Sequence, residues 1–193
     1  MGNKVDYNKQ MKEIPAEGSL LLHACCAPCS SSVLPRLKGF KIIPYFYNPN
    51  IDTVEEYNKR AEQFGKLGVV PQVEKYDHDE FITEVRGLED LPEGGERCRK
   101  CIEMRLRRAA IKAKEEGAEW FCSTLSVSPH KDAEYINEVG KELESKYGVK
   151  FLPNDFKKEN GFLESVRLSR DADLYRQNYC GCEFSRRDVE PKK

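Results

Sequence analysis

The chain of 193 residues carries a formal net charge of −1, which excludes a uniformly basic nucleic-acid binder but not a local basic patch. No apolar run approaches the roughly 20 residues that a membrane span needs, and the polar lead over residues 1–17 has no signal-peptide pattern. We therefore expect a single domain over residues 1–193 in the cytoplasm, with no membrane contact, where eight cysteines indicate metal or redox chemistry.

Predicted strands and helices alternate along the chain. The sequence predicts strands over residues 19–24, 40–47, 69–76, 120–124 and 149–152, with Pro71 weakening the third. It predicts helices through residues 33–37 and over 53–67, 79–85, 98–117, 132–147 and 162–168. This alternation predicts an α/β fold with a mainly parallel five-stranded sheet flanked by helices. Ligands of such sheets bind beyond the carboxyl ends of the strands, where the loop CCAPCSSS falls.

Seven of the cysteines form three clusters. They are Cys25-Cys26-Ala27-Pro28-Cys29, Cys98-Arg99-Lys100-Cys101, and Cys180-Gly181-Cys182 in a C-terminal segment over 154–187. A C-x-x-C pair at a helix start brings two thiolates within reach of one metal, and the helix N-terminus favours the thiolate form. Cys26 with Cys29 and Cys98 with Cys101 both fit this pattern. Together they can supply the four thiolates of a zinc site or an iron–sulfur cluster.

Other interpretations of the cysteines stay open. A closed zinc site is one, although the clusters lie further apart than in zinc ribbons and five thiols exceed tetrahedral zinc by one. A thioredoxin-like dithiol is another, but it leaves the second C-x-x-C without a role. Gly181 permits the tight backbone of a strained, reducible Cys180–Cys182 bond, or these are two unrelated thiols. Cys122 alternates with apolar neighbours and is expected to be a core residue.

The chain also carries polar side chains that suit a site. A cationic run surrounds the second cysteine pair and would either attract a polyanion or form an ordinary charged helix surface; it comprises Arg97, Arg99, Lys100, Arg105, Arg107 and Arg108. His130 and Lys131 follow the fourth strand and are expected to point toward the crevice, unless this segment is only a helix start capped by Asp132. His23 lies within the first strand and is expected to be a hydrogen-bonded core histidine.

Six motifs, in this order between residues 21 and 185, resemble those of the QueH-type epoxyqueuosine reductases. They are HACCAPCS, YFYNPNI, RCRKCIEMRL, STLSVSPHKD, DFKK and YRQNYCGCEFS. The resemblance implies an adenine-nucleotide-α-hydrolase-like, HUP-type sheet, a [4Fe-4S] cluster without cobalamin, a tRNA substrate and an unidentified electron donor. The implied reaction removes the epoxide oxygen of epoxyqueuosine at the wobble position and gives queuosine.

The resemblance also assigns roles to individual cysteines. It implies cluster ligation by Cys25, Cys26, Cys98 and Cys101, and a redox-active pair formed by Cys180 and Cys182. Cys29 is left as a spare thiol or as a ligand to a second metal ion, and His130 and Asp155 are candidates for the acid that protonates the leaving oxygen. The rival functions are a zinc-stabilised RNA-binding module and a tRNA thiolation enzyme of the same fold. Thiolation would need ATP, but CCAPCS stands where ATP-using relatives have a glycine-rich phosphate loop.

Overall fold

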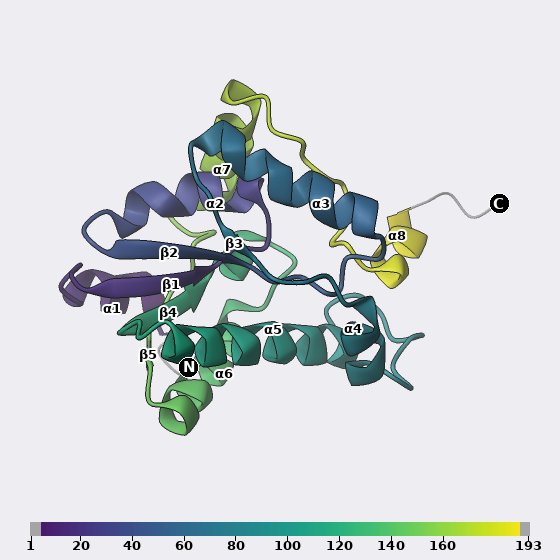
Figure 1. Ribbon diagram of the computed structural model, residues 1–193, viewed down its shortest axis with the longest axis horizontal. Helices are drawn as coiled ribbons and strands as arrows, with labels where there is room; N and C mark the ends of the chain where they lie inside the picture. The colour runs from purple at the N-terminus through teal and green to yellow at the C-terminus, as the bar shows by residue number, and fades with distance from the viewer. Residues whose placement is uncertain (1–4, 190–193) are drawn as a thin grey trace.

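Five short strands form one parallel sheet in the computed structural model, which describes residues 5–189 (Figure 1). The strands are β1 (Ser19–His23), β2 (Lys41–Phe46), β3 (Gln72–Val73), β4 (Trp120–Ser123) and β5 (Lys150–Phe151). Their order is β3-β2-β1-β4-β5, and every pairing is parallel. The predicted α/β class is confirmed, and the doubly wound order is consistent with a HUP-type sheet.

Helices cover both faces of this sheet (Figure 1). One face carries α2 (Ala27–Val33), α3 (Val54–Glu62) and α7 (Gly161–Asp171), and the other carries α5 (Glu96–Glu115) and α6 (Ala133–Tyr147). The central strand is therefore apolar on both sides, with Leu20, Leu21 and Leu22 almost completely buried. Two short helices, α4 (His78–Glu84) and α8 (Glu183–Val189), lie beyond the carboxyl ends of the strands. Within the described residues, no helix has both the length and the apolar character of a membrane span.

Several elements differ from their predicted extent. The third strand shrinks to two residues, because Pro71 just before it has no N–H to donate to the ladder. Helix α2 begins inside the segment predicted as a loop, since Pro28 in its first turn needs no N–H partner there. The polar lead over 1–17, whose first four residues lie outside the described part, contains a further helix, α1 (Tyr7–Glu13). Helix α8 was not predicted from the sequence.

The His23 side chain links the carboxyl ends of three strands, β1, β2 and β4, by hydrogen bonds. Its Nε2 lies 2.9 Å from the carbonyl of Tyr47, and its Nδ1 lies 2.8 Å from Oγ of Ser123. Burial, with a contribution from the charge of Arg105, lowers the pKa of His23 to about 3, so the ring is neutral. A neutral ring that donates to the Tyr47 carbonyl accepts from the Ser123 hydroxyl. The predicted core histidine is confirmed, as is Cys122, which is fully buried in the main core.

Candidate metal and redox site

Three thiols gather directly after the central strand β1. The sulfurs of Cys25, Cys26 and Cys29 all lie within 4.8 Å of one another. The N–H of Cys25 donates to Oγ1 of Thr124 over 2.9 Å, and the Thr124 hydroxyl donates to the Cys25 sulfur over 3.2 Å. Since Thr124 follows β4, the neighbour of β1, these thiols lie at the point where the winding of the sheet reverses. Sheets of this kind bind ligands there.

The chain geometry at Cys26 brings adjacent thiols together. Side chains of neighbouring residues in an extended segment point in opposite directions. The sulfurs of Cys25 and Cys26 are nevertheless 3.9 Å apart, because the chain turns into α2 at the next residue. Hydrogen bonds from Cys25 and Cys29 lower the pKa of Cys26 well below its usual value. The bond with Cys26, together with burial, raises the pKa of Cys25 to about 12, and bonds with both neighbours raise the pKa of Cys29. Of the three thiols, Cys26 therefore ionises most readily.

A second group of thiols lies beside the first. Cys98 and Cys101, on the first two turns of α5, line one small pocket together with Cys180 and Cys182. Cys180 also lines a larger pocket of about 330 Å³ with the three thiols that follow β1. The structure therefore brings seven of the eight cysteines to two adjoining pockets, which share Lys131 among their lining residues.

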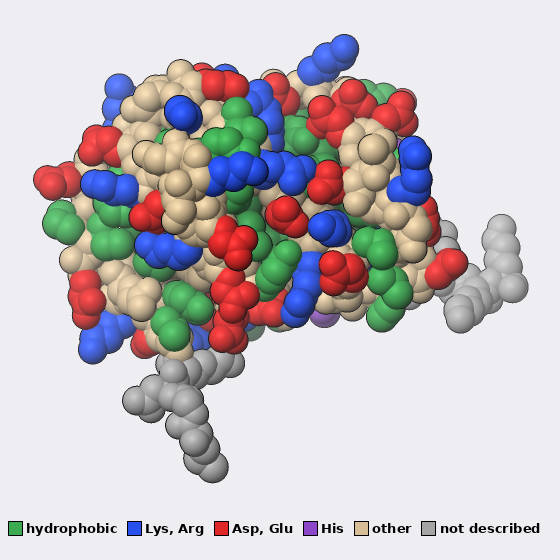
Figure 2. Space-filling view, turned by 90° about the horizontal axis from the view of Figure 1, so that it is seen from below, with side chains coloured by type: hydrophobic (Ala, Val, Ile, Leu, Met, Phe, Trp, Pro, Cys, Tyr) green, Lys and Arg blue, Asp and Glu red, His purple; other side chains and the backbone are tan. Residues whose placement is uncertain are grey.

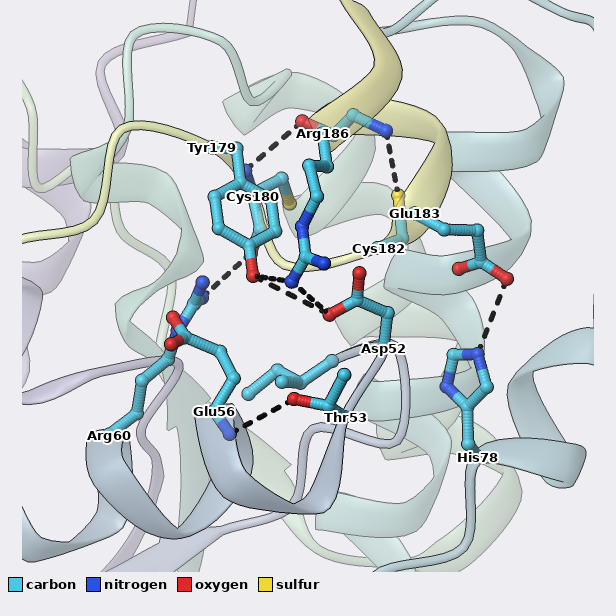
Figure 3. Close-up of polar contacts among 12 residues, drawn as sticks. Asp52, Thr53, Glu56, Arg60, His78, Tyr179, Cys180, Cys182, Glu183 and Arg186 are labelled. Carbon is cyan, nitrogen blue, oxygen red and sulfur yellow. Dashed lines mark hydrogen bonds and ion pairs between the residues drawn. The ribbon is translucent and has the colours of Figure 1, made fainter. Parts of the chain in front are cut away.

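The Cys180-Gly181-Cys182 loop is fixed on the N-terminal end of α3 (Figure 3). The carbonyl of Gly181 accepts the N–H of Asp52 over 3.0 Å, and the carbonyl of Cys180 accepts from the Arg60 guanidinium over 3.0 Å. Gly181 has φ +134°, and a Cβ there would lie 3.1–3.2 Å from three neighbouring side chains. Only glycine combines this backbone conformation with this close approach.

An ion pair ties helix α8 to the same place. The Arg186 guanidinium lies 2.8 Å from Oδ1 of Asp52 and donates over 2.8 Å to the Tyr179 hydroxyl (Figure 3). The Tyr179 ring lies between two guanidinium groups, those of Arg60 and Arg186, at 5.1 and 5.0 Å from its centre. Cation–π contacts of this kind hold an aromatic ring in one orientation. The loop that carries both C-terminal thiols is consequently anchored before and after the cysteines.

The two C-terminal thiols have different electrostatic surroundings. Burial raises the pKa of Cys180, but the charges of Lys131 and Arg105 lower it by more than burial raises it, so the net shift of the pKa is downward. Burial and the charge of Cys180 raise the pKa of Cys182 to about 12. Lys131 itself is 7% exposed and lies 3.6 Å from Glu93. Cys180 is therefore the more acidic thiol of the pair and Cys182 the less acidic one.

We predict that iodoacetamide alkylates Cys180 before Cys182 at neutral pH, because the thiolate is the reacting form. The reaction of Cys180 should slow as the pH falls below its lowered pKa. That of Cys182 should appear only as the pH rises toward its raised pKa of about 12. Lys131→Met should slow the alkylation of Cys180, and Lys131→Arg, which keeps the charge, should not. Peptide mass spectrometry after timed anaerobic labelling measures both rates. Equal rates for the two thiols, or no effect of Lys131→Met, would contradict this assignment.

The predicted cationic run does not form one surface patch. Arg97 and Arg105 are buried, at 1% and 2% exposure. Arg107 pairs with Glu84 at 3.1 Å, and Arg108 pairs with Glu74 at 3.2 Å. The face in Figure 2 shows Lys and Arg side chains interspersed with Asp and Glu. The exposed part of this run is an ordinary charged helix surface, whereas Arg105 belongs to the site.

The two candidate acids lie in different places. His130 is exposed and lines the larger pocket, next to Lys131. Asp155 lines neither pocket, and its carboxylate lies 2.9 Å from Nζ of Lys157.

Sequence reasoning missed Arg60, which holds the Cys180 carbonyl, because a single arginine within a charged helix carries no local signal.

The sheet has a doubly wound order, and thiols from three segments gather at its carboxyl edge. These two features place the chain in the class of cysteine-rich α/β metal and redox proteins. Comparison with known proteins then gives the family. The family model of the epoxyqueuosine reductase QueH matches residues 20–188. The chain therefore belongs to the QueH epoxyqueuosine reductase family, a family of oxidoreductases, which confirms the resemblance of its motifs.

Individual relatives agree over nearly the whole chain. The chain is 42% identical to the epoxyqueuosine reductase QueH of Streptococcus pyogenes, over 94% of this chain and 78% of the relative. It is 40% identical to the QueH of Staphylococcus epidermidis, over 94% and 85% of the two chains. The QueH of Thermotoga maritima is also 40% identical, over 87% of this chain and 90% of the relative.

Proposed function

We propose that this chain reduces the epoxide of epoxyqueuosine to the alkene of queuosine, at the wobble position of a tRNA in the cytoplasm. The convergence of three cysteine clusters on two adjoining pockets carries this proposal. A reductase needs electron-carrying groups beside a space for its substrate, and the larger pocket of about 330 Å³ is large enough for a small organic group.

The proposed ligands of a [4Fe-4S] cluster are Cys25, Cys26, Cys98 and Cys101. Thiolates are the ligands that such clusters take, and the close approach of Cys25 and Cys26 after β1 fits this chemistry. When bound, a cluster of this kind supplies electrons one at a time. Cys29 lies within 4.8 Å of the first two thiols and is available for a second metal ion.

Cys180 and Cys182 are the proposed redox pair. Converting an epoxide to an alkene breaks both carbon–oxygen bonds, consumes two electrons and two protons and releases water. Two thiols supply both electrons and both protons when they join as a disulfide, which an external electron donor then reduces again. His130 and Lys131 line the pocket and can hold or deliver a proton to the leaving oxygen.

The proposal is tested with anaerobically purified protein that has been supplied with iron and sulfide. The protein is incubated with a chemical reductant and a tRNA that carries epoxyqueuosine, and the nucleosides are analysed by mass spectrometry. We expect queuosine to accumulate beyond one equivalent per enzyme, and a tRNA with an unmodified guanosine to stay unchanged. No conversion by protein with full iron content, or a preparation that binds zinc alone, would overturn the proposal.

A further inference from the structure

The Arg105 side chain, from the third turn of α5, ends in the site without an anionic partner. It is 2% exposed and lines the larger pocket together with Cys25 and Cys180. Its Nη1 donates to Oδ1 of Asn48 over 3.2 Å, and its Nε donates to the carbonyl of Cys101 over 3.4 Å. Its Nη2 has no hydrogen-bond partner among residues 5–189. Both partners of this guanidinium are uncharged.

Three other arginines near the site have carboxylate partners. On the same helix, Arg107 and Arg108 form ion pairs with glutamates at the surface. The buried Arg60 has the carboxylate of Glu56 at 2.7 Å. The buried Arg97 donates to the carbonyls of Glu89 and Leu91 and also packs on an aromatic ring. Arg97 thus resembles Arg105 in having only uncharged hydrogen-bond partners among the described residues, and it lines the smaller pocket. Arg105 lines the larger pocket, and the charges of thiols from all three clusters, Cys101, Cys180, Cys25 and Cys98, act on its guanidinium.

A guanidinium keeps its proton in proteins, so Arg105 places a permanent positive charge in the interior. Burying such a charge is unfavourable unless an anion faces it. The two hydrogen-bond partners of Arg105, the Cys101 carbonyl and the Asn48 side-chain amide, are neutral and supply no anion. Deprotonated thiols, or a metal centre that they ligate, would supply one. The cation therefore suits a site whose occupant is negatively charged.

We propose that Arg105 is the counter-cation of the metal centre and raises its reduction potential. This inference rests on the proposed iron–sulfur cluster. Each electron that such a centre accepts from a one-electron donor adds one negative charge to the site, and no bond is made or broken in that step. A fixed positive charge in a medium of low dielectric constant stabilises the reduced form more than the oxidised form. Asn48 is a positioning residue, because its amide donates to the Ala24 carbonyl at 3.0 Å while its oxygen holds Arg105.

The test is an anaerobic redox titration of the holoenzyme, followed by electron paramagnetic resonance and accompanied by iron and sulfide analysis. Arg105→Gln should lower the equilibrium constant for reduction by about tenfold or more, which is about 59 mV for one electron. Arg105→Lys, which keeps the charge, should retain most of the wild-type potential. Arg107→Gln removes the same charge from the surface of the same helix and should leave the potential unchanged.

The possible outcomes separate this inference from the proposed function. Full iron content with an unchanged potential in Arg105→Gln would overturn the counter-cation role and leave the metal centre in place. Absence of iron from the wild-type protein would overturn both. Arg105→Met needs no buried polar partner and replaces Arg105→Gln where that variant does not fold. If the centre assembles in Arg105→Lys but in neither neutral variant, the requirement for charge is supported, whereas failure of all three overturns it.

Discussion

Replacing Cys180 or Cys182 by Ser should stop multiple-turnover reduction of epoxyqueuosine while the metal centre stays intact. With a single thiol left, the enzyme cannot hold two electrons as a dithiol, so conversion should fall to at most one equivalent per enzyme. Serine suits this test because its oxygen can still accept the N–H of Ser185, which lies 3.4 Å from the Cys182 sulfur. The loop on α3 is held by backbone contacts and should keep its place.

The measurement combines nucleoside mass spectrometry with absorption spectra of the same samples and a tRNA binding assay. Binding affinity should be unchanged, because neither thiol is required to contact RNA. Cys122→Ala, which removes a thiol from the core, should retain both the spectrum and turnover. Full turnover in both Ser variants would rule out the redox role. Loss of the cluster spectrum in either variant would make that residue a ligand.

Replacing Cys98 or Cys101 by Ala should remove the metal centre altogether. Each would be one of four thiolate ligands, and a cluster that loses a ligand has no second thiolate on α5 to take its place. Iron and sulfide should fall to background, visible absorption should vanish, and activity should be lost with them. The folded state should persist, because α5 packs on the sheet through a separate set of buried residues that includes Leu106 and Ala109.

This experiment also decides between two groupings of the thiols. The family resemblance joins Cys25 and Cys26 to the pair on α5, whereas the structure places the Cys29 sulfur within 4.8 Å of both. Retention of iron in Cys98→Ala together with its loss in Cys29→Ala would contradict the proposed ligand set. The comparison includes Cys122→Ala as the matched control, and it should keep full iron content.

Much of the fold follows from local patterns in the sequence. Alternating apolar strands and amphipathic helices predict the parallel sheet, because each strand needs a crossover helix to reach its parallel neighbour. The position of CCAPC directly after the first strand predicts thiols at the carboxyl edge, since β1 lies in the centre of such a sheet. The ordered motifs predict the family, and the comparison confirms it.

The structure corrects several local expectations. A loop was predicted over the first cysteines, but α2 begins there at Ala27, with Pro28 in its first turn, and the turn of the chain brings the Cys26 sulfur to 3.9 Å from that of Cys25. The sequence left open whether the cationic run attracts a polyanion or forms an ordinary charged helix surface. Because a helix turns about 100° per residue, Arg105 points inward and Arg107 toward the surface.

The sequence by itself determined the fold class, the family and the placement of CCAPC at the carboxyl edge of the sheet, because these depend on periodicity and on short motifs. Only the tertiary structure decided that Cys180 borders the pockets of both other clusters, that Arg105 lies among the thiols and that Asp155 lies outside the pockets. Those relations join residues far apart in the chain, such as Asp52 with Gly181. Such contacts depend on how α3, α5 and the C-terminal loop pack together, and no local pattern records that packing.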